Sequence, residues 1–141
     1  MESTNKPLRV AIAGLGAIGK SLASRLTEGV VPGVVLTAVS AKNQEKAKEF
    51  VSTLAYPVKV LSISELEPEA DVVVECAPAE LLSDIIAPFL RAKKKAIVLS
   101  VGAILFKPEL IELAKTTGGT IMVPTGALIG LDAMVAAAEG E

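Results

Sequence analysis

Six short aliphatic segments, separated by stretches with helical spacing, constrain the fold of this chain more than any other feature of its sequence. The segments are rich in Val and Ile and are bounded by Gly, Pro or polar residues, which is typical of buried β-strands. The intervals between them are too long for hairpins and suit helical crossovers. The predicted strands are 8–13, 34–40, 58–61, 71–75, 96–100 and 120–123.

The intervals between these strands supply the helices. Apolar residues recur there every three or four positions, so that one face of each helix can pack against a sheet. Pro88 lies inside the third helix and is predicted to kink it or split it in two. Strands that alternate with helices through right-handed crossovers predict a doubly wound, Rossmann-type sheet of six parallel strands, in the order 3-2-1-4-5-6 and in a three-layer α/β/α arrangement. The predicted helices are 17–28, 43–54, 79–93 and 107–116.

Composition excludes several classes of function for this single-domain chain of 141 residues. A net charge of −2 and an aromatic content of 3% argue against a nucleic-acid binder. With no histidine and one cysteine, the chain cannot form a His/Cys zinc site of the usual kind, a Ser-His-Asp triad or an internal disulfide. No apolar run approaches the ~20 residues that span a bilayer, and residues 1–7 are polar, which predicts a cytoplasmic domain without a membrane partner.

The strongest local motif is a glycine-rich turn between the first predicted strand and the first predicted helix. Its GxGxxG spacing in that position is typical of dinucleotide binding. Gly14 would allow the tight turn, Gly16 would let the backbone approach a diphosphate, and Gly19 would let the helix pack close to the sheet. Free N–H groups at the helix N-terminus would then face the diphosphate, and the alternative is a glycine-rich turn without a ligand. The predicted cofactor contacts here are Gly14, Leu15, Gly16, Ala17, Ile18 and Gly19.

The end of the second predicted strand bears on the choice of cofactor. An acidic residue at this place would bind the ribose hydroxyls of NAD and repel a 2′-phosphate. This chain has Ser40, Lys42 and Asn43 there, and no carboxylate. Hydroxyl, ammonium and amide groups are compatible with a 2′-phosphate, so we predict NADP, or dual use, over strict NAD. In a purely structural interpretation Ser40 and Asn43 cap the next helix and Lys42 is solvated, and the two interpretations are compatible.

Two further segments follow predicted strands at the same edge of the sheet. The carboxyl ends of the strands line the cofactor cleft in a doubly wound sheet, and small residues there would let a dinucleotide pass closely. Glu75 would reach either a ribose or a structural donor. Cys76 fits a packed residue better than a nucleophile, because no histidine is present to activate it. The predicted contacts are Cys76, Ala77, Pro78, Ser100 and Gly102.

The segment after the sixth predicted strand carries a resemblance to a known family. Residues 124–134 read PTGALIGLDAM and residues 73–78 read VVECAP. With these segments the whole chain resembles the N-terminal NAD(P)-binding domain of L-aspartate dehydrogenase. The resemblance implies an oxidoreductase that converts L-aspartate to iminoaspartate and oxaloacetate with reduction of NAD(P)⁺, a reaction linked to NAD biosynthesis. It also implies that Ala127 contacts the cofactor. From the residues alone, the two glycines of this loop either leave backbone groups free to contact the nicotinamide or a substrate, or are simply the exit turn into a last helix.

The chain departs from this family in two ways. Ile129 stands where the family usually has a second consecutive glycine. The family also carries a second, α+β domain with the substrate pocket and a catalytic histidine, and this chain contains no histidine. We therefore expect a flexible N-terminus at 1–7, a dinucleotide-binding domain at 8–130 and, at 131–141, the start of a helix that connects to a missing second domain. No catalytic residue is assigned, and an amino-acid substrate would bind only with the second domain.

Two other interpretations stay open. One is a free-standing module that senses a dinucleotide or binds a partner and has no chemistry of its own. The other is the first domain of a different two-domain dehydrogenase, of the sugar or homoserine type. An apolar surface near the C-terminus predicts a homo-oligomer or a partner subunit in each case. Its residues are Leu128, Ile129, Leu131, Met134 and Val135.

Overall fold

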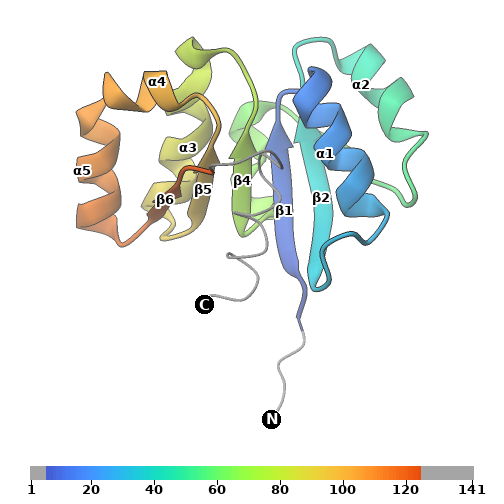
Figure 1. The fold of residues 1–141 in the computed structure, drawn as a ribbon, viewed down its shortest axis with the longest axis horizontal. Helices are drawn as coiled ribbons and strands as arrows, with labels where there is room; N and C mark the ends of the chain where they lie inside the picture. The colour runs from blue at the N-terminus through green and yellow to red at the C-terminus, as the bar shows by residue number, and fades with distance from the viewer. Residues whose placement is uncertain (1–5, 125–141) are drawn as a thin grey trace.

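Six parallel strands form one open sheet in the computed structural model, which describes residues 6–124 (Figure 1). The strand order is β3-β2-β1-β4-β5-β6 and every neighbouring pair is parallel, which confirms the predicted topology. The first two strands have their predicted bounds, whereas the third is a pair of residues at the sheet edge. The strands are β1 (Leu8–Ala13), β2 (Val34–Ser40), β3 (Lys59–Val60), β4 (Val72–Glu75), β5 (Lys95–Val98) and β6 (Thr120–Met122).

Helices and short 3₁₀ turns connect the strands. Between residues 6 and 124 no helix is long and apolar enough to cross a membrane. The helices are α1 (Ala17–Thr27), α2 (Gln44–Val51), α3 (Leu82–Arg91), α4 (Val101–Leu105) and α5 (Pro108–Thr117), and the 3₁₀ turns are η1 (Ile63–Glu65), η2 (Glu67–Glu69) and η3 (Ala79–Leu81).

The predicted end of the fifth strand is wrong. β5 ends at Val98 rather than at residue 100, and residues 101–105 form the short helix α4, for which no helix was predicted. The reason is a contact between distant residues, because the backbone N–H of Ser100 donates to the Glu75 side chain rather than to a neighbouring strand. Five residues are also too few to show helical periodicity in a sequence.

Pro88 does not split the third helix. The segment begins as the 3₁₀ turn η3 and continues as α3 through Pro88 to Arg91. An internal proline costs about 3 kcal/mol. Full burial of one aliphatic or aromatic side chain contributes about 1.5–3 kcal/mol. The cost is therefore outweighed by the buried face of α3, which comprises Leu82, Ile85, Ile86, Ala87, Phe89 and Leu90.

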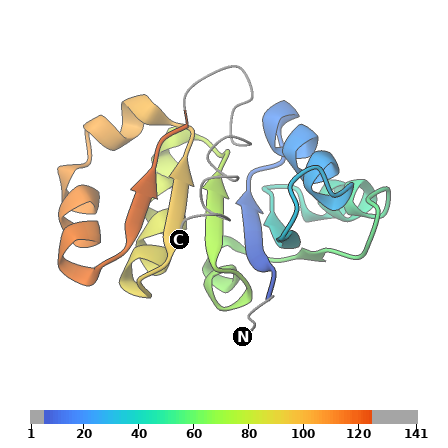
Figure 2. The same cartoon turned by 60° about the horizontal axis from the view of Figure 1, so that its bottom comes forward.

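The helices lie on both faces of the sheet, α1 and α2 on one and α3, α4 and α5 on the other (Figures 1 and 2). Strand side chains differ in size between the two faces. The strands present mostly alanine toward α3, and the large side chains of that helix fill the space. They present larger residues toward α1, which contributes the small Ala23 between Leu22 and Leu26. The strand residues toward α3 are Ala11, Ala13, Ala38, Val73, Ala96 and Val98, and those toward α1 are Val10, Ile12, Leu36, Val39, Val72, Val74 and Ile97.

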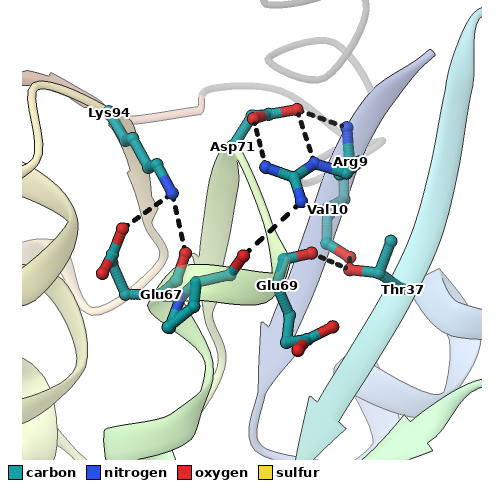
Figure 3. Close-up of polar contacts among 8 residues, drawn as sticks. Arg9, Val10, Thr37, Glu67, Glu69, Asp71 and Lys94 are labelled. Carbon is teal, nitrogen blue, oxygen red and sulfur yellow. Dashed lines mark hydrogen bonds and ion pairs between the residues drawn. The ribbon is translucent and has the colours of Figure 1, made fainter. Parts of the chain in front are cut away.

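Side chains join the strands at the amino edge of the sheet, where β1, β4 and β5 begin (Figure 3). Asp71 precedes β4, and its carboxylate accepts hydrogen bonds from Arg9 through the backbone N–H at 3.0 Å, Nε at 3.3 Å and Nη2 at 2.9 Å. Lys94 precedes β5, and its Nζ lies 2.7 Å from the Glu67 carboxylate and 2.8 Å from the Glu67 carbonyl oxygen. Three strands are thereby tied to one another and to η2.

Thr37 connects β2 with β1 and η2 at a β-bulge. Val10 pairs with Leu36 and Ala11 pairs with Ala38, so Thr37 is the extra residue of β2. The Thr37 hydroxyl lies 3.1 Å from the Val10 carbonyl oxygen and 2.8 Å from the Glu69 carbonyl oxygen. The bulge therefore docks η2 on the sheet instead of leaving an unpaired carbonyl.

Candidate functional site

The carboxyl edge of the sheet, opposite the network around Arg9, holds an open cavity of about 890 Å³. The ends of β1, β2 and β4 form its floor, and α1, α2, η1 and η3 border it. This is the crevice in which doubly wound sheets bind ligands, beside the point where the strand order reverses. The predicted contacts that line it are Gly14, Leu15, Gly16, Ser40, Lys42, Asn43, Cys76, Ala77 and Pro78.

The three glycines of the first turn differ in what an added side chain would meet. Gly14 has a φ of +107°, and a Cβ added there would lie 2.5 Å from the carbonyl oxygen of Cys76. A Cβ at Gly19 would overlap the carbonyl oxygen of Gly14. A Cβ at Gly16 would meet nothing within 4 Å, because Gly16 faces the cavity. The turn itself therefore needs glycine at 14 and 19, whereas the space in front of Gly16 is available to a ligand.

The N-terminus of α1 opens onto this space. Gly16 is the N-cap residue, no side chain caps the helix, and the first turn carries no acidic residue. Uncapped N–H groups and the positive end of the helix dipole favour an anion. The turn therefore has the geometry and the charge of a phosphate site.

Lysines dominate the charged groups of the cavity wall. Lys20 comes from α1, Lys46 from α2 and Lys42 from the loop between β2 and α2. Glu80 is the only acidic residue among the lining residues that the structure describes. The Lys20 ammonium lies 5.8 Å from the centroid of the Phe50 ring. A wall with this excess of positive charge concentrates anionic ligands.

At the end of β2, Asn43 and Ser40 have structural roles, whereas Lys42 is available to a ligand. Asn43 caps α2, because its side-chain oxygen accepts a hydrogen bond from the backbone N–H of Lys46 at 3.0 Å. Ser40 is buried, and its carbonyl oxygen accepts from the Gly14 N–H at 2.7 Å. Lys42 is exposed beside the cavity. Of the three, Lys42 is thus the residue most available to a ligand.

The thiol of Cys76 fits the predicted packing role. Burial raises its pKa, and the neighbouring Glu75 carboxylate raises it further, to about 12. The thiol stays protonated at neutral pH, and a protonated thiol is a poor nucleophile.

Other predicted contacts do not line the cavity or lie outside the described residues. Gly19 acts through packing, Ser100 is the N-cap residue of α4, and Gly102 lies within α4. Ala127, the apolar residues near the C-terminus and the boundary at 130/131 lie outside residues 6–124, so these stay predictions. The predicted contacts absent from the cavity wall are Ala17, Ile18, Gly19, Ser100 and Gly102.

Several lining residues were missed by sequence reasoning. Lys20 had a usable signal, because it lies one helical turn after Gly16. Ser62 and Ile63 had none, since only the path of the chain after β3 brings η1 to the cavity. The missed residues are Lys20, Ala41, Gln44, Lys46, Ala47, Ser62, Ile63, Glu80 and Leu81.

Known proteins match this chain at both the sequence and the fold level. The model of the family described as homoserine dehydrogenase, NAD binding domain, matches residues 14–124. The chain belongs to this family. The matched range of this NAD-binding domain includes the glycine turn, the ends of β2 and β4, and every described residue of the cavity wall.

Curated relatives confirm the resemblance to L-aspartate dehydrogenase. L-aspartate dehydrogenase 3 of Bordetella bronchiseptica is 53% identical over 98% of this chain and 51% of its own length. L-aspartate dehydrogenase of Bradyrhizobium diazoefficiens is 46% identical over 99% of the chain and 49% of its own length. The NAD-binding domain thus spans about half the length of the relatives that it matches.

Solved structures share the fold of this NAD-binding domain. A probable dehydrogenase from Thermotoga maritima superposes with a TM-score of 0.70 at 22% identity, over 82% of this chain and 35% of that one. Biliverdin reductase from Synechocystis, solved with biliverdin and NADP⁺, superposes with a TM-score of 0.67 at 22% identity, over 83% of this chain and 37% of that one. At these identities the likeness establishes the Rossmann-type architecture.

Proposed function

We propose that this chain is the cofactor-binding part of an L-aspartate dehydrogenase. The observation that carries the proposal is 53% identity to L-aspartate dehydrogenase 3 over 98% of the chain, which includes the whole cavity wall. The family-wide likeness to homoserine dehydrogenase domains favours homoserine as the second candidate substrate. When bound, the nicotinamide of the cofactor supplies the hydride chemistry, and the chain orients it.

The two halves of a dinucleotide would lie on opposite sides of the glycine turn. Gly14 and Gly16 would place the diphosphate on the N-terminus of α1, where there is room for it in front of Gly16. The adenosine half would extend along the end of β2 and the other half along the end of β4. Lys42 and Lys46 at the β2 side support a preference for the 2′-phosphate of NADP. The chain would be inactive alone, because a second domain of the complete protein would bind the amino-acid substrate and move its proton.

A fluorescence titration with NADH and NADPH tests cofactor binding. We expect the wild-type chain to bind at least one of the two with micromolar affinity, and NADPH more tightly than NADH. In Gly16→Val the affinity should fall at least about tenfold, because the new side chain fills the space for the diphosphate. Ser21→Val is the matched control, since it introduces the same side chain at an exposed position of α1 that does not line the cavity. Normal NADPH binding by Gly16→Val would refute the placement of the phosphates.

Turnover of the complete enzyme tests the substrate. The 141-residue chain should not oxidise L-aspartate, whereas the chain joined to the second half of an L-aspartate dehydrogenase should do so and should prefer L-aspartate to homoserine. Aspartate oxidation by the isolated chain would contradict the proposed division of labour. Cytoplasmic location and self-association through the apolar C-terminal residues stay predictions, and light scattering at high concentration tests the latter.

A further inference from the structure

Glu75 is the only charged side chain that residues 6–124 bury completely. It ends β4, and the three residues that follow it line the cavity. A buried carboxylate is costly unless its oxygens are hydrogen-bonded, and an apolar side chain of similar volume usually serves stability equally well or better. The position of Glu75 therefore calls for a role beyond packing.

The carboxylate binds the segment that leaves β5. Its Oε1 accepts hydrogen bonds from the backbone N–H of Leu99 at 3.1 Å and of Ser100 at 2.9 Å, and its Oε2 accepts from the Ser100 hydroxyl at 2.7 Å. No lysine or arginine of the described residues forms an ion pair with it. All three contacts act on two consecutive residues, so Glu75 fixes the path of the chain between β5 and α4.

This path borders the part of the edge that the dinucleotide must reach. The cavity runs from the end of β2 across β1 to the end of β4, and β5 is the next strand in the sheet. With the diphosphate at β1 and the adenosine at β2, the nicotinamide half extends toward β4 and β5. The turn at Leu99 and Ser100 lies at the end of β5, and β5 lies on the same side of β1 and its glycine turn as β4.

We propose that Glu75 is a positioning residue for the nicotinamide half of the cofactor. Its carboxylate fixes the turn at Leu99 and Ser100, and this turn forms the boundary against which the nicotinamide half lies. The Ser100 hydroxyl is occupied by Glu75 and acts through that contact. The inference rests on the proposed function, because it requires that a dinucleotide binds in the cavity.

Comparison of ADP-ribose with NADH in the 141-residue chain tests the inference. ADP-ribose contains the adenosine, the diphosphate and a second ribose but no nicotinamide, so it reports on the glycine turn and the β2 side. In Glu75→Ala the Ser100 N–H and hydroxyl lose their acceptor, whereas the Leu99 N–H keeps only its 3.3 Å hydrogen bond to the Glu75 carbonyl oxygen. We expect NADH to bind about tenfold more weakly, the value of one hydrogen bond to a charged group, and ADP-ribose to change less than twofold.

Glu75→Gln is the conservative variant that separates position from charge. Its amide oxygen can accept from both N–H groups, and its NH₂ group can donate to the Ser100 hydroxyl oxygen. We expect NADH affinity within about threefold of the wild-type chain, and the emission spectrum of bound NADH unchanged. Thr27→Val, which removes a different buried hydroxyl at the far end of α1, should change neither ligand.

The outcomes separate this inference from the proposed function. Equal loss of ADP-ribose and NADH in Glu75→Ala, or no loss of either, overturns the positioning role while leaving dinucleotide binding intact. Failure of the wild-type chain to bind either ligand refutes the proposed function and the inference with it. If Glu75→Ala does not fold, Ser100→Ala decides, because it removes only the 2.7 Å contact. Ser100→Ala should weaken NADH binding about threefold without weakening ADP-ribose binding, and an unchanged NADH affinity would overturn the positioning role of Glu75.

Discussion

The two edges of the sheet use polar groups in opposite ways. At the amino edge the charged side chains bind one another, as Arg9 binds Asp71 and Lys94 binds Glu67 (Figure 3). At the carboxyl edge Lys42 and Lys46 form no ion pair within residues 6–124, and an uncapped helix N-terminus faces the cavity. Paired groups stabilise the fold and leave nothing for a ligand, whereas unpaired groups beside a cavity provide binding. Substitutions at the two edges should therefore separate stability from affinity.

The largest expected effect is that of Gly14→Ala at the carboxyl edge. A side chain there would adopt a left-handed backbone and contact the carbonyl oxygen of Cys76. Backbone strain of about 1–2 kcal/mol and steric overlap of about 1–3 kcal/mol should together lower the free energy of unfolding by about 2–5 kcal/mol. Urea denaturation measures this loss. A loss below about 1 kcal/mol would contradict the geometry of the turn. Gly16→Val is the comparison variant and should cost less stability, because a Cβ at Gly16 meets nothing within 4 Å and Val is only a poorer helix N-cap than Gly.

A smaller effect, on affinity alone, is expected from Lys42→Ala. Under the proposed placement of a 2′-phosphate beside Lys42, removal of this cation should weaken NADPH binding about tenfold and NADH binding less than twofold, without changing the midpoint of urea unfolding. The comparison is made by fluorescence titration at low salt, where screening is weakest. Lys48→Ala is the matched control, because Lys48 is exposed on α2 but does not line the cavity. Equal weakening of NADPH and NADH binding would show that Lys42 does not contact the 2′-phosphate.

The smallest effect is expected at the amino edge, from Asp71→Asn. The Asp71 side chain is 37% exposed, so solvent screening limits its ion pair with Arg9. We expect a loss of about 1 kcal/mol in the free energy of unfolding and no change in NADPH affinity. Glu112→Gln is the control, because the Glu112 to Lys115 pair is longer and more exposed and should leave stability unchanged. A change in NADPH affinity in Asp71→Asn would refute the separation of the two edges.

The pH dependence of the same variant sharpens this comparison. Partial burial alone would raise the pKa of Asp71, but the hydrogen bonds and charge of Arg9 outweigh it and bring the pKa below the usual 3.8. The unfolded chain therefore binds the proton more readily than the folded one, and the contribution of Asp71 is lost as the pH falls through its folded pKa. Urea unfolding should show an unchanged difference between wild type and Asp71→Asn from pH 7 to 5, and a smaller one below about pH 3. A difference that grows in acid would contradict this sign.

The sequence predicted most elements because their signals are local and strong. β1 and β2 carry enough β-branched residues to fix their bounds, and the spacing of the glycines placed the turn before α1. The end of β5 was misplaced because Ser100 binds Glu75, which lies 25 positions away. The predicted split at Pro88 did not occur because the cost of the proline is local, whereas the burial that outweighs it depends on the packed sheet.

The sequence by itself determined the alternation of strand and helix, the parallel sheet and the glycine turn, since hydrophobic period and backbone freedom are properties of neighbouring residues. Only the tertiary structure decided which side chains meet at each edge. It brought Lys46 and Ile63 to one cavity with the glycine turn and buried Glu75 against the end of β5. These outcomes depend on distances between segments that are far apart in the chain, and such distances exist only once the sheet has packed.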